Sequence, residues 1–443
     1  MVSEVKTIFS KASGRAGHYR IPSIVKTKSG VLVACADERF YTCRDNPNRI
    51  DKVVRRSLDN GLTWEEQIVV VEEVGESMQD ASAAIDPCML YDENSDTVFM
   101  IYSHTPAGVG ILKCKKGLGQ DKDGNLYLYE GKKRYTLKDG KVYDKTGMVN
   151  QDYAVMPNGD VTFKGQPAGN YKLNSGKLKE LKSSHLYITS SNDDGLTWSE
   201  PVNITNQVKE KYMSFIGAGP GVGITVKEGK YKGRLIFPIY YNVVERFQIL
   251  MLSACVMYSD DNGKTWHRGK SPNQTRKHGI FPVGHRFVLP NDMITETQLI
   301  ECEGGRLKMF MRNHSSKKLI ATAISDDGGE TWQEYKHHPQ LTHCICQCCV
   351  INGEEDGREV TLFLNAADTK ARRNGVIRLS YDYGETFEYS KLIKQGEFVY
   401  SCMVWLGDGK IGVLYEENTQ HEEINFITLT LDEIKSGEQF KAI

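Results

Sequence analysis

The chain has 443 residues, and 56 Lys plus Arg nearly balance 57 Asp plus Glu, so its formal net charge is −1. This balance argues against a nucleic-acid-binding or polybasic membrane-surface protein, because no net cationic field is present to attract phosphates, although a local cationic pocket remains open. Its longest apolar stretch falls far short of the roughly 18 residues that a membrane-spanning helix needs.

The first motif along the chain is His18-Tyr-Arg-Ile-Pro22, which ends 35 residues before the first of a series of repeats. The segment ahead of it, residues 1–17, has no apolar core and no small-residue cleavage site, so we do not expect a secretory signal peptide there. The compartment stays open: secreted or cell-surface if the sequence is an excised domain, cytoplasmic if it is full length.

An octet with the pattern Ser-x-Asp-x-Gly-x-Thr-Trp recurs along the chain. Four close copies, and a fifth in which Phe replaces Trp, span residues 57–64, 191–198, 259–266, 325–332 and 380–387. The pattern predicts a tight hairpin, because the Asp side chain caps backbone amides and Gly tolerates a positive φ. The Trp can then cover the turn as an apolar plug. We therefore predict that the octet aspartates maintain the fold and take no part in chemistry.

The spacing of the octets predicts the architecture. Their starts step by 134, 68, 66 and 55 residues, and 134 is twice 67. Each octet follows a β-rich run, and helical periodicity is scarce throughout. A period of about 55–70 residues of strand, turn and strand has the size of a propeller blade. The sequence thus predicts an all-β fold.

The long first step contains a segment of different composition, residues 117–182. It is rich in Lys, Gly, Tyr and Asn, and it carries the hairpin dipeptides Asp123-Gly124, Asp139-Gly140 and Asn158-Gly159. We predict that this segment is a small β-rich insertion within the propeller.

Two further patterns do not indicate cofactor or metal sites. The run Gly217-Ala-Gly-Pro-Gly-Val-Gly223 does not fit a dinucleotide-binding loop, and we expect a close backbone approach there. In the patch Cys344-Ile-Cys-Gln-Cys-Cys349 the period of two would place Cys344, Cys346 and Cys348 on one face of a strand. We interpret them as buried strand residues, with metal binding as the minor alternative because repeated CxxC pairs are missing.

The combination of Arg-Ile-Pro at residues 20–22 with several octets resembles the sialidases, and more closely the larger bacterial exo-sialidases. The resemblance extends from Tyr19 to about Glu417. Together with the blade-sized period, it implies a six-bladed antiparallel propeller formed by residues 1–443, with the site at its axis and the octets on the outer rim. It also implies action on sialylated glycoproteins, glycolipids and oligosaccharides, without a cofactor or a metal.

Sialic acid carries a carboxylate, which the planar guanidinium of Arg can bind bidentately. The resemblance assigns this task to three arginines: Arg20, Arg312 and Arg372. Arg373 competes with Arg372, but the distance of three residues to Gly375 favours Arg372. Three converging arginines need a counter-charge, and Glu416 matches the family's glutamate that orients the first of them.

The general acid is expected in the loop after the second strand of the first blade, where Asp45 matches the family position. A residue that protonates the leaving oxygen and then activates water should have a pKa raised toward the working pH. Its neighbour Arg44 would oppose this if it pointed inward. Arg39 matches the arginine that helps hold the O4 side of the sugar, and Asp86 matches an acidic pocket residue near O4 and the N-acyl group.

The resemblance places the nucleophile at Tyr400 and its base at Glu296. A neutral phenol suits the reaction, because the substrate carboxylate would repel a carboxylate nucleophile, and sialidases are glycosidases with a Tyr nucleophile. An ordinary Tyr has a pKa of about 10, so a base must lie within hydrogen-bond reach. Glu296 precedes Arg312 by 16 residues, the spacing expected across a hairpin between adjacent inner strands.

Three functions remain open at this point. The first is a retaining exo-α-sialidase that works through a Tyr-linked covalent intermediate. The second is an intramolecular trans-sialidase that releases 2,7-anhydro sialic acid with the same catalytic set. The third is a non-catalytic glycan-binding propeller, which is disfavoured because the arginine triad, Tyr400, Glu296 and Asp45 occur together.

Overall fold

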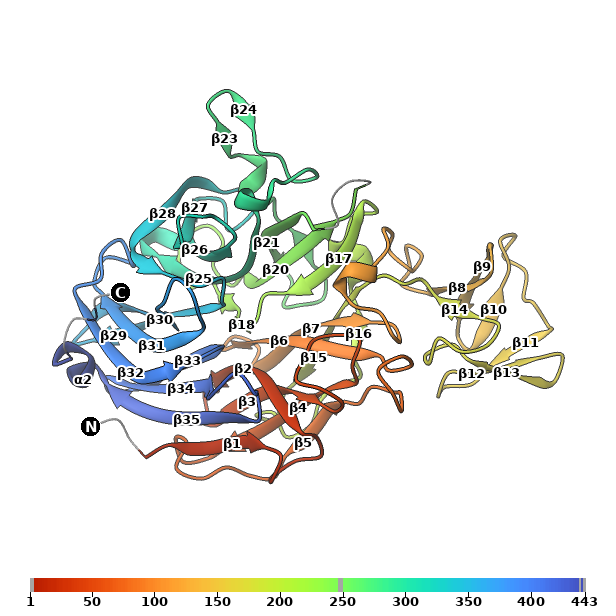
Figure 1. The fold of residues 1–443 in the computed structure, drawn as a ribbon, viewed down its shortest axis with the longest axis horizontal. Coiled ribbons are helices and arrows are strands. Elements are labelled where there is room, and N and C mark those ends of the chain that lie inside the picture. The colour runs from red at the N-terminus through yellow and green to blue at the C-terminus, as the bar shows by residue number, and fades with distance from the viewer. Residues whose placement is uncertain (1–3, 246–249, 438–439, 441–443) are drawn as a thin grey trace.

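Figure 1 shows the computed structural model of the chain, which describes residues 4–245, 250–437 and 440. β-Strands make up nearly all of its regular structure, so the predicted predominance of strands is confirmed. The described residues contain two short α-helices, α1 (Thr205–Val208) and α2 (Leu431–Lys435). Short 3-10 turns are η1 (Ile111–Lys113), η2 (Pro272–Gln274), η3 (Pro290–Asp292) and η4 (Glu303–Gly305). None of the described helices has the length and apolar character needed to cross a membrane.

The strands of the main body form six antiparallel meanders of four strands each within the described residues. The first two are β2 (His18–Lys26), β3 (Leu32–Arg39), β4 (Ile50–Ser57), β5 (Ile68–Val71), and β6 (Ala83–Asp92), β7 (Thr97–Thr105), β15 (His185–Ser191), β16 (Val202–Asn203). The next two are β17 (Met213–Ala218), β20 (Leu235–Val243), β21 (Leu252–Ser259), β22 (His267–Arg268), and β25 (Ile294–Cys302), β26 (Arg306–Asn313), β27 (Leu319–Ser325), β28 (Gln333–Thr342). The last two are β29 (Cys348–Glu355), β30 (Arg358–Ala366), β31 (Arg373–Ser380), β32 (Tyr389–Glu397), and β33 (Ser401–Gly407), β34 (Lys410–Glu416), β35 (Glu423–Thr430), β1 (Lys6–Ser10).

The sixth meander joins the two ends of the chain. Strand β1 from the N-terminal part pairs antiparallel with β35 from the C-terminal part, with Lys6 opposite Phe426. The first strands of neighbouring meanders also contact one another, as in the pairs β2–β6, β25–β29, β29–β33 and β33–β2. The starts of these strands therefore gather in one region, although they lie far apart in the sequence.

Each octet links the third and fourth strands of a meander. In the first copy, the hydroxyls of Ser57 and Thr63 donate to the Asp59 carboxylate at 2.8 and 2.6 Å, and the Gly61 amide donates to Ser57 Oγ at 2.8 Å. The same three contacts recur in the other copies. The sixth meander has no octet because its third and fourth strands, β35 and β1, come from opposite ends of the chain.

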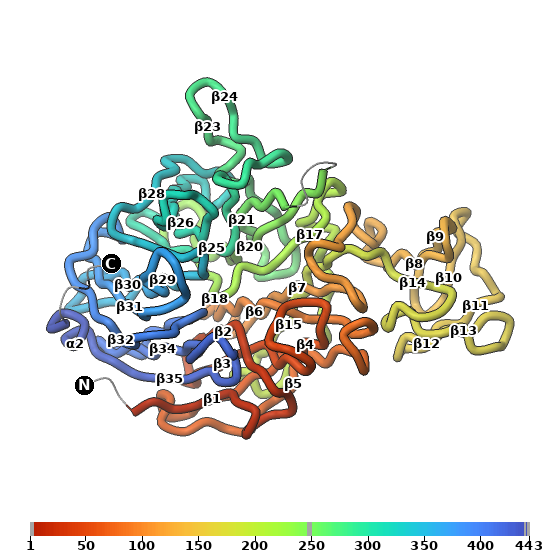
Figure 2. Tube along the Cα trace, viewed as in Figure 1, coloured from red at the N-terminus to blue at the C-terminus, as the bar shows by residue number. Residues whose placement is uncertain are grey.

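Residues 126–180 leave the second meander between β7 and β15 and form a lobe of their own, seen at the right of Figures 1 and 2. One small sheet contains β8 (Leu126–Glu130), β9 (Lys133–Lys138), β10 (Lys141–Tyr143) and β14 (Lys179–Glu180). The other contains β11 (Tyr153–Val155), β12 (Asp160–Phe163) and β13 (Gln166–Asn170). The lobe has a separate core that includes Leu128, Val142 and Leu178. The lobe accounts for the long spacing between the first and second octets, because it adds residues to the second meander between β7 and β15.

Four of the first strands, β2, β6, β17 and β25, shift register in their first half. At the bulges of β2 and β6, Ile21 and Asp86 have φ angles of 58° and 62°, and each is followed by Pro. A positive φ costs about 1–3 kcal/mol for such residues, so the surrounding structure must hold it. A bulge changes the direction in which nearby side chains point, here Arg20 and Asp86.

The glycine-rich run lies among the first strands. Gln298 and Gln347 donate to the carbonyl of Pro220 at 3.1 and 3.4 Å, and Ser23 donates to the carbonyl of Gly221 at 2.7 Å. A Cβ on Gly221 would lie 2.5 Å from the Gln298 side chain, and the φ of Gly221 is 125°. The predicted close backbone approach is confirmed, because only glycine fits at this position.

The cysteine patch differs from its prediction. Strand β29 begins only at Cys348, whereas Cys344 and Cys346 lie in the preceding loop. The chain turns at Ile345, whose φ is 61°. The expectation that three alternating cysteines share a strand face is therefore wrong, because one left-handed residue breaks the strand periodicity that the sequence suggested. Cys346 and Cys348 are nevertheless buried, and Cys344 is half-buried.

Candidate active site

Tyr400 lies at the centre of a cluster formed by the predicted residues. Its hydroxyl donates to Glu296 Oε1 at 2.5 Å. Arg312 Nη1 donates to Tyr400 Oη at 2.8 Å and to Glu296 Oε2 at 2.7 Å. Tyr400 directly precedes β33, whereas Glu296 and Arg312 lie on the paired strands β25 and β26. A carboxylate in contact with a phenol can accept its proton, so this arrangement can generate a phenolate nucleophile.

Three arginines converge on Tyr400. Besides Arg312, the guanidinium carbons of Arg20 and Arg372 lie 5.5 and 5.4 Å from the centre of the Tyr400 ring. Arg20 comes from β2, and Arg372 directly precedes β31. The side chain of Arg373 is 49% exposed and pairs with another carboxylate, so Arg372 is the member of this pair beside Tyr400. Together the three guanidinium groups can bind a carboxylate.

Glu416, at the end of β34, supplies the counter-charge for Arg20. Its carboxylate is fully buried and lies 3.4 Å from Arg20 Nε. It also accepts a hydrogen bond from the Ile21 amide at 2.8 Å and contacts His421 Nδ1 at 2.8 Å. Burial alone would raise the pKa of Glu416, but Arg20 and His421 lower it to about 2. Glu416 therefore stays ionised and fixes the position of Arg20.

The protonation state of Tyr400 follows from its surroundings. Burial, and then the charge of Glu296, raise the pKa of Tyr400 well above its ordinary value, and Arg312 and Arg372 oppose this shift only in part. The phenol is therefore neutral at rest. A free phenolate thus does not accumulate, and any attack by Tyr400 Oη would require its proton to pass to Glu296.

Asp45 lies in the loop between β3 and β4, with its side chain 70% exposed. Its Oδ1 lies 2.8 Å from Arg39 Nη1 and 3.6 Å from Arg20 Nη1. Partial burial of the carboxyl group would raise the pKa of Asp45, but these two arginines lower it to about 2. The prediction of a raised pKa is therefore wrong for this arrangement of charges. The responsible cations are Arg39 and Arg20, and the neighbouring Arg44 is exposed.

Asp86 and Arg39 lie on the same side of the cluster as Asp45. Asp86 is 8% exposed and accepts a long hydrogen bond, 3.5 Å, from Tyr240 Oη. Burial, and then the carboxylates of Asp37 and Asp45, raise the pKa of Asp86 well above its ordinary value. Arg39 is fully buried, and its terminal nitrogens donate to Asp37 and Asp45, both at 2.8 Å. In this arrangement Arg39 holds the loop that carries Asp45.

Sequence reasoning missed four residues of this cluster: Asp37, Lys52, Tyr240 and His421. Asp37 and Lys52 form a fully buried ion pair between β3 and β4, next to Arg39. Asp37 directly follows the apolar run of residues 32–36 within β3, which is a signal that could have indicated a buried charge there. His421 offered no such signal, because only the folded loop after β34 brings it onto Glu416.

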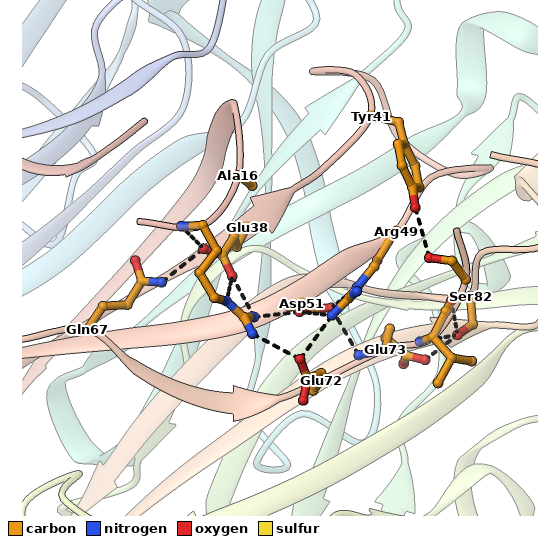
Figure 3. A network of polar contacts seen from close by, with 12 residues as sticks. Ala16, Glu38, Tyr41, Arg49, Asp51, Gln67, Glu72, Glu73 and Ser82 are labelled. Carbon is orange, nitrogen blue, oxygen red and sulfur yellow. Dashed lines mark hydrogen bonds and ion pairs between the residues drawn. The ribbon is translucent and has the colours of Figure 1, made fainter. Parts of the chain in front are cut away.

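A second polar network, shown in Figure 3, supports the base of the Asp45 loop. Glu38 on β3 and Asp51 on β4 lie directly opposite each other, and both are fully buried. Arg15 pairs with both carboxylates at 2.7 and 2.6 Å, and Arg49 pairs with Asp51 at 3.1 Å. The guanidinium of Arg49 lies 4.3 Å from the Phe40 ring centre. Two arginines thus offset the repulsion of two buried carboxylates where the loop begins and ends.

Solved structures of similar fold include two intramolecular trans-sialidases. The enzyme of Ruminococcus gnavus superposes with a TM-score of 0.80 over 97% of this chain and 98% of that chain, at 24% identity. The leech enzyme gives a TM-score of 0.80 over 98% of this chain and 71% of that chain, at 23% identity. The chain therefore has the mostly β fold of these sialidase structures.

The BNR repeat-like domain family matches residues 170–413, and the chain belongs to this family. The anhydrosialidase of Macrobdella decora is 26% identical over 470 residues, covering 91% of this chain and 58% of that protein. The sialidase of Bacteroides fragilis is 27% identical over 423 residues, covering 93% of this chain and 62% of that protein. The chain is thus a homologue of sialidases and spans roughly three fifths of the length of these two relatives.

Proposed function

We propose that the chain is a retaining exo-α-sialidase that removes terminal sialic acid from glycoproteins, glycolipids and oligosaccharides. The observation that carries this proposal is the contact of Tyr400 with both Glu296 and Arg312, with Arg20 and Arg372 beside the same ring. A carboxylate held by the three arginines would place the anomeric carbon that bears it next to Tyr400 Oη. Such positioning supplies a large part of the rate enhancement in enzymes.

We also propose that the six meanders are the blades of a closed six-bladed propeller within residues 1–443, with residues 117–182 as its β-rich insertion. The contacts between successive first strands support this arrangement. The pairing of β1 with β35 supports it as well, because it completes the last sheet with a strand from the other end of the chain. Closure leaves no long sheet edge open to pairing with other chains.

The proposed reaction has two steps. In the first, Tyr400 Oη bonds to the anomeric carbon while its proton passes to Glu296, and the leaving oxygen takes a proton from Asp45 as its bond to that carbon breaks. In the second, water attacks the anomeric carbon and gives a proton to Asp45. The bond to Tyr400 breaks as water attacks, and the phenol regains its proton from Glu296. Two displacements at one carbon retain its configuration.

Asp45 must be protonated to act in the first step, although its pKa is about 2 beside Arg39 and Arg20. The substrate carboxylate offers a reason for a change. It would compete with Asp45 for Arg20 and would add a negative charge close to Asp45, and both effects raise the pKa of a carboxyl group. Substrate binding would thus favour protonation of Asp45, while Arg39 keeps the loop of Asp45 in place.

A second candidate is an intramolecular trans-sialidase that releases 2,7-anhydro sialic acid. The similarity to the leech anhydrosialidase and to the Ruminococcus gnavus enzyme supports it. The first step would be the same. In the second step a hydroxyl of the bound sugar would replace water as the attacking group, so the product would be one water lighter than sialic acid.

One experiment separates the candidates. The purified chain is incubated with sialyllactose, and the released sugar is analysed by mass spectrometry, with Tyr400→Phe as the control. Free sialic acid supports the hydrolase, and a product one water lighter supports the trans-sialidase. If the unaltered chain releases neither sugar, both catalytic proposals are wrong and a glycan-binding role is left.

A further inference from the structure

A hairpin with exposed apolar residues projects between β22 and β25. It contains β23 (Lys277–His278) and β24 (Phe281–Pro282) and stands away from the body at the top of Figure 1. Ile280 is 84% exposed and Phe281 is 70% exposed, the highest values for large hydrophobic residues within the described residues. Phe287 and Leu289 follow at 60% and 53%. Single exposed apolar residues are common, but a cluster on a projecting hairpin marks a contact surface.

Three cationic residues lie in the hairpin or beside it. Lys277 lies in β23, Arg286 follows the hairpin with its guanidinium carbon 4.2 Å from the Tyr212 ring centre, and Lys317 lines a cavity of about 620 Å³ at the base of the hairpin together with Lys277. Among the described residues, none of these three cations has an acidic partner at ion-pair distance. Arg276 in the same cavity is held by Asp292 at 2.9 Å, and its guanidinium lies 3.7 Å from the Tyr335 ring centre. Asp292 therefore holds Arg276 at the base of the hairpin, and the unpaired positive charge lies beside that base, behind the apolar tip formed by Ile280 and Phe281.

The hairpin lies on the same face of the molecule as the catalytic cluster. The predicted residues gather at the beginnings of the first strands and the ends of the second strands. In an antiparallel meander of four strands, the fourth strand ends at that same side, and the hairpin belongs to the connection from β22 to β25. It leads to Asp292, four residues before Glu296. The octets, which follow the third strands, lie at the opposite side.

We propose that residues 276–289 form a membrane-contact element that binds anionic phospholipid surfaces. Ile280, Phe281 and Phe287 enter the interfacial region of the bilayer, and Lys277, Arg286 and Lys317 contact lipid phosphates. Apolar burial combined with attraction to anionic lipid is the usual basis of such binding. This inference rests on the proposed function and specifies its substrate class: sialoglycans carried on membrane lipids, which would lie close to a chain held at the bilayer surface.

The first test is sedimentation with lipid vesicles, made either of phosphatidylcholine alone or of phosphatidylcholine with phosphatidylserine. The unaltered chain should bind the vesicles that contain phosphatidylserine, and added salt should weaken this binding. The double variant Ile280→Ser with Phe281→Ser should reduce binding by about tenfold or more, because the loss of a single buried apolar side chain is already expected to weaken binding about tenfold. The matched control is Leu62→Ser with Leu196→Ser, two exposed apolar residues, 67% and 52%, on the octet side.

Two results would overturn the proposal: no vesicle binding by the unaltered chain, or equal losses in the hairpin variant and the control. Loss of a concentration-dependent dimer in the hairpin variant, without vesicle binding by the parent, would assign the hairpin to self-association instead. Turnover of a small soluble sialoside should be unchanged in both variants, which verifies their fold. Vesicle binding without any turnover would refute the proposed function alone, and turnover without vesicle binding would refute the membrane contact alone.

Discussion

At the octet side, hydrogen bonds from the Thr63 side chain and amide hold the pKa of Asp59 at about 2. On the side of the candidate active site, burial and two neighbouring carboxylates raise the pKa of Asp86 well above its ordinary value. The first aspartate receives its partners from within eight residues of chain, and the arrangement recurs in every octet. The second meets groups that come from several different strands.

The two aspartates therefore differ in role: Asp59 stabilises a local turn, whereas Asp86 lies among the predicted site residues. A local hydrogen-bonded motif stabilises its own turn and can be repeated wherever a turn is needed. Buried groups of like charge oppose folding unless other groups hold them, so they persist where they serve a task. Tyr400, Asp45 and Asp86 all have shifted pKa values, and all three lie in one cluster. The following predictions test this difference in role, beginning with the largest expected effect.

Replacing Tyr400 by Phe should have the largest effect on turnover. Phe has no oxygen with which to form the covalent intermediate, so kcat should fall by about 10⁴-fold or more on every substrate, whatever its leaving group. Steady-state kinetics on natural and aryl sialosides would measure the loss. Sialic acid should still bind, because the arginines remain. Near-normal turnover in Tyr400→Phe would remove the nucleophile assignment.

Replacing Asp45 by Ala should produce a loss that depends on the leaving group. Natural glycosides release an alcohol that needs a proton, so their turnover should fall by about 10²–10⁴-fold. Aryl sialosides with acidic phenols need little protonation and should lose much less in the first step. Comparison of the two substrate types measures the difference. Equal losses, with the first step limiting, would exclude Asp45 as the general acid.

Glu416 should make stability depend on pH below neutrality. Its folded pKa of about 2 lies below the ordinary value, so its contribution is complete above about pH 5 and is lost as pH falls toward 2. The shift corresponds to about 3 kcal/mol. Urea unfolding at neutral and acidic pH should show a smaller pH dependence for Glu416→Gln than for the parent. The exposed Glu422→Gln is the matched control, and an unchanged pH dependence in Glu416→Gln would contradict the prediction.

Replacing Arg312 by Lys should weaken substrate binding moderately. Lys keeps the charge but lacks the planar fork that contacts two groups at once, so the loss should be about 1–3 kcal/mol. KM and kcat for a soluble sialoside would measure it. Arg373→Lys is the control, because Arg373 pairs with a carboxylate outside the cluster. Kinetics like those of the parent in Arg312→Lys would place Arg312 outside the binding site.

Replacing Asp261 by Ala should reduce stability and leave catalysis unaffected. The change removes the acceptor for Ser259 and Thr265, so the free energy of unfolding should fall by about 1–2 kcal/mol. Denaturant unfolding measures this loss, and kcat at a temperature where the variant is folded should match the parent. A large drop in kcat in folded protein would show that the two sides of the molecule are not separate in function.

The octets were predictable because every partner in them lies within eight residues. The Ser, Asp, Gly and Thr positions fix the turn locally, and the structure repeats the same contacts in each copy. The predominance of strands follows from the same local patterns. The site residues were found through the resemblance, because nothing in the local sequence distinguishes Tyr400 from the other 21 of the 22 tyrosines.

The tertiary structure alone decided how distant charges meet. Asp45 follows a strand that gives no sign of Arg20, yet Arg20 and Arg39 together lower its pKa to about 2. The loop at Cys344 likewise depends on one left-handed residue, Ile345, which periodicity cannot reveal. Local sequence determines turns and strands because their hydrogen bonds close over a few residues. The electrostatics of the site depend on contacts between strands far apart in the chain, which exist only when the sheets have assembled.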